Sequence, residues 1–271
     1  MTSATRPEAR PEALFLPDGD GFKATNASLG PWGPDMLHGG AVSALLVQLL
    51  EEQGGPGWVP SRFTVDLVRP VTTGHLDVEG RVVRQGKRIQ LLEAEILSDG
   101  KLSARCTYLR MSEVPVDLPA GAPIESATPP PDSPATFYEA PLFEPDKVFF
   151  VRTGIEMRVP DPGKFGGGVA WYRLLLPVLP GRQAPPMASV VAAGDFGNGL
   201  SGFRDRAFPQ GVTFLNADLD VHVFRPPVGQ WVRLQAISAW NPNGTGLALG
   251  ELADTSGSLG VSQQSLVLSQ I

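Results

Sequence analysis

Two stretches of the chain are apolar on nearly every face that a helix would present. One covers residues 37–52 and becomes polar only at Glu51 and Glu52; the other, Pro186–Leu200, reads PMASVVAAGDFGNGL. A helix that is apolar all round is normally buried. The pattern therefore predicts two interior helices, the second of which ends at one acidic residue, Asp195, before a glycine-rich segment.

Each of these helices is followed by runs in which apolar and polar residues alternate, as in a strand with one buried face. The first run of each set stops at an Arg-Pro pair, Arg69-Pro70 and Arg225-Pro226, because proline cannot continue a sheet ladder. The expected strands are 62–68, 76–84, 88–97 and 101–110 after the first helix, and 218–224, 231–240, 246–253 and 259–268 after the second.

Other segments are expected to be shorter or irregular. A strand pair is predicted at 14–16 and 21–25, and two strands at 148–159 and 169–176, separated by a turn over 160–168. The PGKFGGG sequence of that turn lacks the Gly-Lys-Ser/Thr order of a phosphate-binding loop. Residues 112–145, with Pro129-Pro130-Pro131, have weak periodicity and are typical of an extended linker.

The same order of elements occurs twice along the chain. In both halves a buried helix precedes a strand ending at Arg-Pro, and three further strands follow. Such repetition indicates an internal duplication of a unit of roughly a hundred residues. We expect an α+β protein in which each helix is covered by antiparallel sheet. Its predicted parts are an N-terminal unit (1–112), a Pro-rich linker (113–146) and a C-terminal unit (147–271).

The composition narrows the class of protein. Of the 271 residues 42% are hydrophobic, and the formal net charge of −6 argues against nucleic-acid binding, which needs a basic surface. Cys106 is the only cysteine, so no intrachain disulfide can form. We expect a cytoplasmic protein without a secretory signal or a membrane span, since the apolar helices are short and interrupted. No Cys/His cluster suggests a metal site.

Asp195 and the start of the first helix are the candidate reactive groups. A carboxylate at the end of an apolar helix must find hydrogen-bond donors or carry a raised pKa, and both situations are common at active sites. The first helix begins with His38-Gly39-Gly40. Helix starts leave backbone N–H groups free, and glycine lets a ligand approach them closely.

The predicted unit resembles the hotdog fold: an antiparallel sheet wraps around a central helix that starts with HGG, and a strand that ends at Arg-Pro follows the helix. Two such units, from about Leu14 to Leu268, resemble the double-hotdog acyl-CoA thioesterases similar to bacterial thioesterase II. The resemblance implies a double hotdog that hydrolyses a fatty or related acyl thioester. It implies a substrate from lipid metabolism, attached to coenzyme A or to an acyl carrier, and no cofactor.

The family's catalytic residues map onto this chain with one departure. Its Asp matches Asp195, and its Gln matches Gln263 or Gln264, of which we favour Gln264. Its Thr falls on Asn216, an amide that can still donate and accept hydrogen bonds. The resemblance implies that these groups orient or deprotonate the attacking water.

The first half resembles single-unit hotdog thioesterases, in which an HGG segment opens the helix and an acid follows nine residues after the His. Here the HGG is present but position nine is Val47, whereas the second half has the acid and carries Pro186-Met187-Ala188 instead of HGG. We expect the halves to pair so that Asp195 faces Gly39 and Gly40, the candidate oxyanion donors. The pseudo-symmetric second site is expected to be inactive.

Plainer interpretations stay open for each of these residues. Asp195 is also explained as a turn residue, Asn216 as a loop or strand-start residue that happens to align, Gln264 as a polar strand position, and the two glycines by close packing. His38 is interpreted as structural, holding its loop through a ring hydrogen bond.

Two alternative functions also stay open. One is a non-catalytic acyl-CoA or lipid-binding protein. The other, which ranks lower, is a hotdog hydratase or dehydratase, because no His follows the acid in GDFGNGLS. Whether the chain forms a homo-oligomer is left open.

Overall fold

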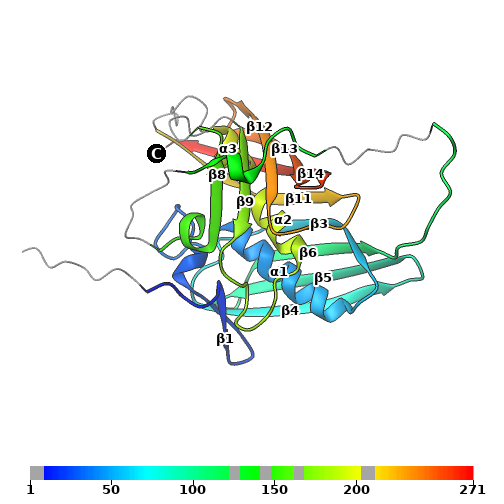
Figure 1. Ribbon diagram of the computed structural model, residues 1–271. Helices are drawn as coiled ribbons and strands as arrows, with labels where there is room; N and C mark the ends of the chain where they lie inside the picture. Colours follow the sequence, from blue (N-terminus) through cyan, green and yellow to red (C-terminus); the bar gives the residue numbers. More distant parts are fainter. Residues whose placement is uncertain (1–8, 122–128, 141–147, 162–167, 203–210, 271) are drawn as a thin grey trace, which may run out of the picture.

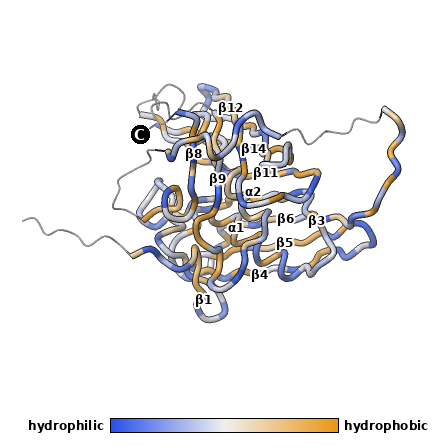
Figure 2. Tube along the Cα trace, in the orientation of Figure 1, coloured by the Kyte–Doolittle hydropathy of each residue, from blue (hydrophilic) through white to orange (hydrophobic). Residues whose placement is uncertain are grey.

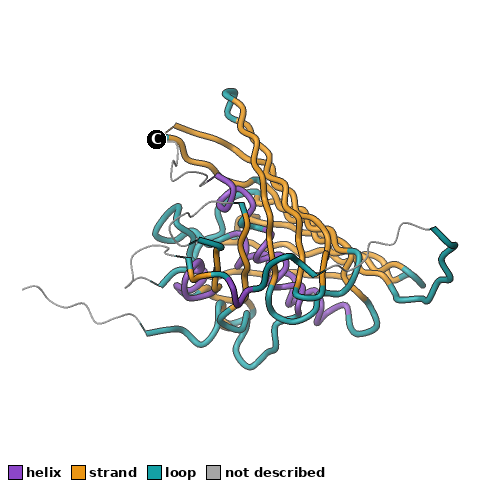
Figure 3. Tube along the Cα trace, turned by 45° about the horizontal axis from the view of Figure 1, so that its top comes forward, coloured by secondary structure: helices purple, strands orange, loops and turns teal. Residues whose placement is uncertain are grey.

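The computed structural model describes residues 9–121, 129–140, 148–161, 168–202 and 211–270. In this part of the chain the strands form one antiparallel sheet, in the order β1-β2-β4-β5-β6-β3-β11-β14-β13-β12-β9-β8-β7, with β10 paired to β14. Helices α1 (Gly39–Gly54) and α2 (Pro186–Gly194) pack against each other on one side of the twisted sheet (Figures 1 and 3). None of the described helices is long and apolar enough to cross a membrane.

Most strands lie within a few residues of their predicted bounds, and the two strands β7 and β10 were not predicted. The first-half strands are β1 (Phe15–Asp18), β2 (Gly21–Ala24), β3 (Val59–Leu67), β4 (His75–Gln85), β5 (Ile89–Ser98) and β6 (Lys101–Met111). The second-half strands are β7 (Tyr138–Glu139), β8 (Ile155–Val159), β9 (Val169–Leu174), β10 (Val212–Asn216), β11 (Asp218–Val223), β12 (Val232–Asn241), β13 (Thr245–Asp254) and β14 (Gly257–Gln270).

The strand order reads the same from both ends towards a central pair, β3 and β11. At the centre of that pair Thr64 lies opposite Asp220, 156 residues later. The same separation relates the starts of β5 and β13, Ile89 and Thr245, and those of β6 and β14, Lys101 and Gly257. The two halves of the sheet therefore have the same strand order and nearly the same spacing.

Helix α1 is buried along most of its length, as its sequence predicts. Apolar residues gather where it meets α2 and the strands, and the outer turns are hydrophilic (Figure 2). Its N-cap is His38. At the other end Gln90 donates to the Gly54 carbonyl and Arg110 to the Gly55 carbonyl. The last carbonyls of this buried helix are thereby paired, as burial requires.

The second predicted helix is interrupted. Helix α2 ends at Gly194, Asp195 is its C-cap, and a separate helix, α3 (Gly197–Gly202), follows. The Gln264 side chain fills the break, because its amide nitrogen donates to the Asp195 carbonyl while its oxygen accepts the Asn198 N–H. A side chain inserted into the backbone ladder is a known cause of a break, and the glycines around it weaken the helix further.

The predicted strand over 148–159 is wrong in its first half. Phe150–Gly154 forms a π-helical turn, and β8 begins only at Ile155. The turn packs against the short 3₁₀ helix η1 (Asn26–Ser28): the Phe150 N–H donates to Leu29, and a Cβ on Gly154 would lie 2.5 Å from the Ala27 carbonyl oxygen. The two contacting segments are far apart in the sequence, so the local pattern of apolar and polar residues does not predict this turn.

The Pro-rich segment returns to the body of the protein. After an irregular stretch that projects from the sheet (Figure 1), it forms a 3₁₀ turn (Pro134–Thr136) and the short strand β7, which pairs with β8. Asp132 accepts hydrogen bonds from Trp171 and Arg233. Residues 122–128 and 141–147 of this segment, and 162–167 of the predicted turn, lie outside the described residues. The division into units and linker stays a prediction.

Candidate active site

The Asp195 carboxylate lies where the two halves of the chain meet. The residue is 7% exposed and caps α2, and its side chain reaches the first residue of α1. A Cβ on Gly39 would lie 2.9 Å from Asp195 Oδ1 and 3.0 Å from Oδ2. Only glycine fits at this position without displacing the carboxylate.

One oxygen of Asp195 is held by two amides. Oδ1 accepts from Asn216 Nδ2 at 2.8 Å and from Gln264 Nε2 at 3.3 Å. Gln264 is 2% exposed and points inward from β14, whereas Gln263 points to the exposed outer face. The structure therefore brings together Asp195, Asn216, Gln264 and Gly39, and strand alternation selects Gln264 over its neighbour.

The amide orientations follow from their partners. Gln264 Nε2 also donates to the Asp195 carbonyl at 3.0 Å, so both of its hydrogens are directed at that residue. Asn216 Nδ2 also donates to the Asp218 carbonyl, at 3.3 Å. Both Asn216 hydrogens are thus used within the protein, and its Oδ1 has no donor among the described residues. Asn216 keeps one acceptor for a ligand, and Gln264 keeps none.

The other oxygen of Asp195 faces His38. Oδ2 lies 2.9 Å from His38 Nδ1, and the two side chains are 1% and 6% exposed. The same Nδ1 accepts the Gly40 N–H at 3.1 Å. The structural interpretation of His38 missed this contact with the acid. Its position immediately before the glycine pair of a buried helix was the available signal.

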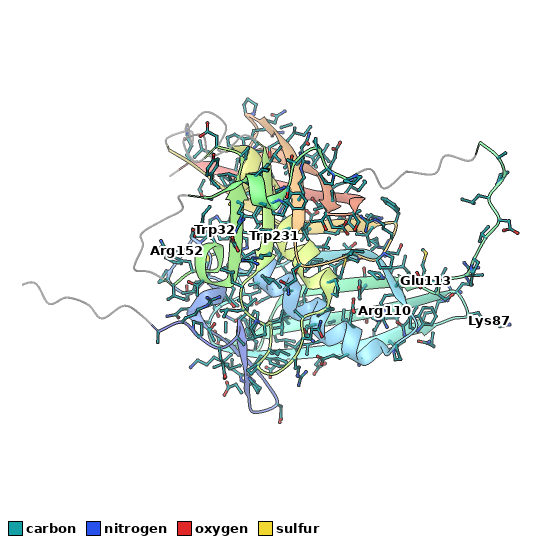
Figure 4. The ribbon with its side chains drawn as sticks, in the orientation of Figure 1. Trp32, Lys87, Arg110, Glu113, Arg152 and Trp231 are labelled. Atoms are coloured by element: carbon teal, nitrogen blue, oxygen red, sulfur yellow. The ribbon has the colours of Figure 1, made fainter. Side chains whose placement is uncertain are left out.

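Aromatic rings surround the His38 imidazole. Its centroid lies 4.7 Å from that of Phe196, 4.9 Å from Phe150 and 5.4 Å from Trp32. Trp32 stands at the His38 end of α1, opposite the Arg110 end (Figure 4). Rings on these sides exclude water, which strengthens electrostatic interactions inside the site.

Two backbone N–H groups open α1. The Gly39 N–H has no acceptor among the described residues, whereas the Gly40 N–H is paired with His38. Gly40 also lies against α2, since a Cβ there would be 2.9 Å from the Ala192 carbonyl oxygen. Close helix packing therefore explains one glycine, and the carboxylate contact explains the other.

A cavity of about 240 Å³ adjoins these groups and has Gly39 and Asn216 in its wall. Its lining is mainly apolar and comes from both halves of the chain; it includes Trp32, Met36, Leu37, Leu67, Leu215 and Val267. A larger hollow of about 380 Å³ lies over β3, β5 and β6. It is lined by polar side chains, and none of the site residues borders it. The smaller cavity is the one that a substrate of this site would enter.

Other groups with shifted pKa values lie apart from this cluster. Burial raises the pKa of the Cys106 thiol to about 12, so it is not a thiolate at neutral pH and is a poor nucleophile. Hydrogen bonds from the His75 ring to Asp18 and Asp77 raise the pKa of that imidazole, on the exposed surface. Asp195 and His38 form a separate titratable pair, which lies behind Gly39 of the cavity wall.

Family models match both halves of the chain. Residues 29–111 match an acyl-CoA thioesterase N-terminal domain, and residues 125–268 match an acyl-CoA thioesterase C-terminal domain. The sequence search of curated proteins found no match.

Solved structures of the same fold cover nearly the whole chain. A protein from Novosphingobium aromaticivorans assigned as a thioesterase is 21% identical, with a TM-score of 0.67, and the match covers 94% of this chain and 98% of that one. One from Thermobifida fusca assigned as a thioesterase II is 14% identical, with a TM-score of 0.70 and 96% coverage of both chains.

A conserved protein with a hot dog fold from Alicyclobacillus acidocaldarius is 14% identical, with a TM-score of 0.68, and the match covers 96% of this chain and 97% of that one. At these identities the structures establish the hotdog fold, while the two family models establish the family. The chain belongs to the acyl-CoA thioesterase family, and it is a thioester hydrolase.

Proposed function

We propose that this protein hydrolyses fatty or related acyl-CoA thioesters with a water molecule that Asp195 positions and deprotonates. One observation carries the proposal: the Asp195 carboxylate contacts Gly39 and Asn216, and both of these residues lie in the wall of an apolar cavity built by both halves. A thioester carbonyl is already electrophilic. Hydrolysis therefore needs a placed water, a base and donors for the developing oxyanion.

The geometry supports a distinct role for each residue. Asp195 Oδ2 is the base, because Oδ1 is already engaged by two amides. Asn216 Oδ1 accepts one hydrogen of the water, since the other end of that amide holds Asp195. Gln264 fixes the carboxylate and touches no substrate. The free Gly39 N–H at the positive end of α1 receives the oxyanion. The Gly40 N–H next to it, which donates to His38 Nδ1 in this structure, is the second donor once that bond opens.

The acyl chain would occupy the apolar cavity. An engineered cavity of about 150 Å³ binds benzene, which has six carbons. At the same degree of filling, the 240 Å³ found here accommodates roughly ten carbons. A pantetheine arm carries two amides that need hydrogen-bond partners, and this lining offers few. We therefore place a medium-length acyl chain inside and the coenzyme A portion towards solvent.

We further propose that the chain is a double hotdog that arose by internal duplication, with units at 1–112 and 147–271 joined by the Pro-rich linker. The palindromic strand order and the repeated 156-residue separation support this. At the helix position that corresponds to Asp195, the first half carries the buried Val47. One of two ancestral sites would then remain active. We place the enzyme in cytoplasmic lipid metabolism.

A chain-length series of acyl-CoA substrates tests the proposal. We expect the highest kcat/KM at eight to ten carbons, and a loss of at least about 100-fold in kcat for Asp195→Asn, as expected on removing a general base. Gln263→Asn, on the outer face of β14, is the matched control and should leave kcat unchanged. Tight binding of acyl-CoA without turnover would select the non-catalytic alternative. Full activity of Asp195→Asn would remove the proposed mechanism.

A further inference from the structure

The Nδ1 atom of His38 has two partners and can serve one at a time. It accepts the Gly40 N–H at 3.1 Å, which requires its lone pair. It also lies 2.9 Å from Asp195 Oδ2, which requires a proton between the two atoms for a favourable contact. Asp195 Oδ2 is buried and has no other partner among the described residues. An unprotonated ring nitrogen therefore caps α1, and a protonated one donates to the acid.

We propose, on the basis of the hydrolytic function above, that His38 is a positioning residue that couples proton transfer to completion of the oxyanion hole. When Nδ1 is unprotonated, it accepts the Gly40 N–H, and only the Gly39 N–H is available to an oxyanion. When Nδ1 receives a proton, the bond to Gly40 is lost and the second N–H becomes free to donate. At rest the hole is half formed, and two acceptor atoms, Nδ1 and the ionised Oδ2, face each other at 2.9 Å. Arrival of a proton between them relieves this unfavourable contact and completes the hole as the oxyanion appears.

The proton path is balanced. Water gives a proton to Asp195 Oδ2 as its oxygen bonds to the thioester carbon, and the carbonyl electron pair moves onto oxygen. The proton passes 2.9 Å from Oδ2 to Nδ1, which releases Gly40. On collapse the carbon–sulfur bond breaks, its electron pair goes to sulfur, and the proton returns through Oδ2 to the thiolate. The acid and the thiol leave, and Nδ1 again accepts the Gly40 N–H.

The surroundings of His38 suit such a switch. Phe196, Phe150 and Trp32 hold the ring in place on its other sides. Asp195 is the titratable group at Nδ1, and it is itself fixed by Asn216 and Gln264. The carboxylate cannot turn away, so the proton is the element that moves.

Two variants separate this switch from a purely structural cap. Asparagine is a good N-cap, so in His38→Asn the side-chain oxygen holds the Gly40 N–H permanently. In His38→Ala no cap exists and that N–H is free. We expect kcat to rank wild type, then Ala, then Asn, with the last at least about 100-fold below wild type, which is the worth of one oxyanion donor. A purely structural cap predicts the opposite order of the two variants, because asparagine restores the N-cap that alanine removes.

A second readout does not depend on turnover. In the ¹⁵N-labelled protein, the Gly40 amide signal should shift with pH together with His38 Nδ1, and it should stop responding in His38→Asn. Independent titration of the two signals, or kcat of the Asn variant at or above that of the Ala variant, would overturn the proposal. If wild type hydrolyses no thioester while the two signals still move together, the proposed function fails and the switch stands.

Discussion

Asn216 uses the two ends of its carboxamide differently. Its nitrogen donates to Asp195 Oδ1 and to the Asp218 carbonyl, which leaves its oxygen without a donor among the described residues, and the residue is part of the cavity wall. A threonine hydroxyl, which the resemblance to thioesterase II leads one to expect here, has a single hydrogen to donate but can also accept. Asparagine therefore retains the donor that holds the acid and the acceptor that a water needs.

Substitutions at Asn216 should separate these two roles. Asn216→Thr keeps one donor and one acceptor, so we expect kcat within about tenfold of wild type. Asn216→Asp has the same shape but places a second carboxyl beside Asp195, and two close carboxylates do not both ionise. We expect it to lose at least about 100-fold in kcat and its pH profile to change shape. Equal activity of the two variants in steady-state assays would show that Asn216 does not contact the acid.

Among the secondary-structure elements, the break between α2 and α3 places the acid. Had the helix continued through Asp195, the Asn198 N–H would pair with the Gly194 carbonyl, and Gln264 would have no backbone partners there. Instead the amide of a strand residue 69 positions beyond Asp195 joins the helix end to α3. Three of its hydrogen bonds lie in the buried interior, so their loss leaves several polar groups unpaired.

Gln264→Leu should therefore destabilise the fold as well as the site. Each buried polar group left without a partner costs about 1–3 kcal/mol, so we expect a loss of roughly 2–4 kcal/mol in the free energy of unfolding. Gln263→Leu is the matched control on the exposed face of the same strand, with an expected change within about 0.5 kcal/mol. Urea denaturation of both variants measures the difference. Equal midpoints would contradict the role assigned to the break.

The loop at the end of β13 depends on a buried ion pair. Burial alone would raise the pKa of the Asp254 carboxyl, but hydrogen bonds from Arg225 and from the Val228 and Ser256 N–H groups lower it below its ordinary value. A lowered pKa means that the stabilisation is present above about pH 4 and is lost as the pH falls through the folded-state pKa.

Asp254→Asn should reveal this contribution. The variant removes the carboxylate that neutralises Arg225, which keeps only its bonds to backbone carbonyls such as those of Gly257 and Ser258. Breaking a buried ion pair costs about 3–5 kcal/mol. We expect that loss at pH 7, and a smaller fall of the urea midpoint between pH 6 and pH 3 than wild type shows. Parallel pH curves for the two proteins would place the acid sensitivity elsewhere.

The contrast between local burial and distant contacts explains which elements the sequence predicts. Helix α1 and the meanders β3–β6 and β11–β14 have periodicities set by local burial, so their pattern is readable. The helix break, the turn over Phe150–Gly154 and β10 depend on contacts with Gln264, Leu29 and β14, which local pattern does not encode. Asp195 was identifiable as the one acid ending an apolar helix. The contact of His38 with it required the second helix to be placed beside the first.

At the scale of the whole molecule, the proposed duplication gives the site a counterpart in the first half. In the site itself, Asp195 lies against Gly39. In the counterpart, Val47 corresponds to the acid, and Tyr108, 156 residues before Gln264, corresponds to the amide. Val47 and the Tyr108 ring are fully buried, and the tyrosine hydroxyl donates to Glu51. On this proposal, apolar packing and a structural hydrogen bond stand where a second site would have its reactive groups.

One active site per chain is therefore expected. A non-hydrolysable acyl-CoA thioether should bind with a stoichiometry of one per chain in calorimetry, and Leu215→Trp, which fills the apolar cavity beside Gly39, should abolish that binding. Val47→Asp in an Asp195→Asn background should restore no activity, since an unpaired buried carboxylate becomes neutral or destabilises the fold. Circular dichroism checks that the variants remain folded. A stoichiometry of two, or recovered turnover in the double variant, would mean that the second position has kept a functional substrate site.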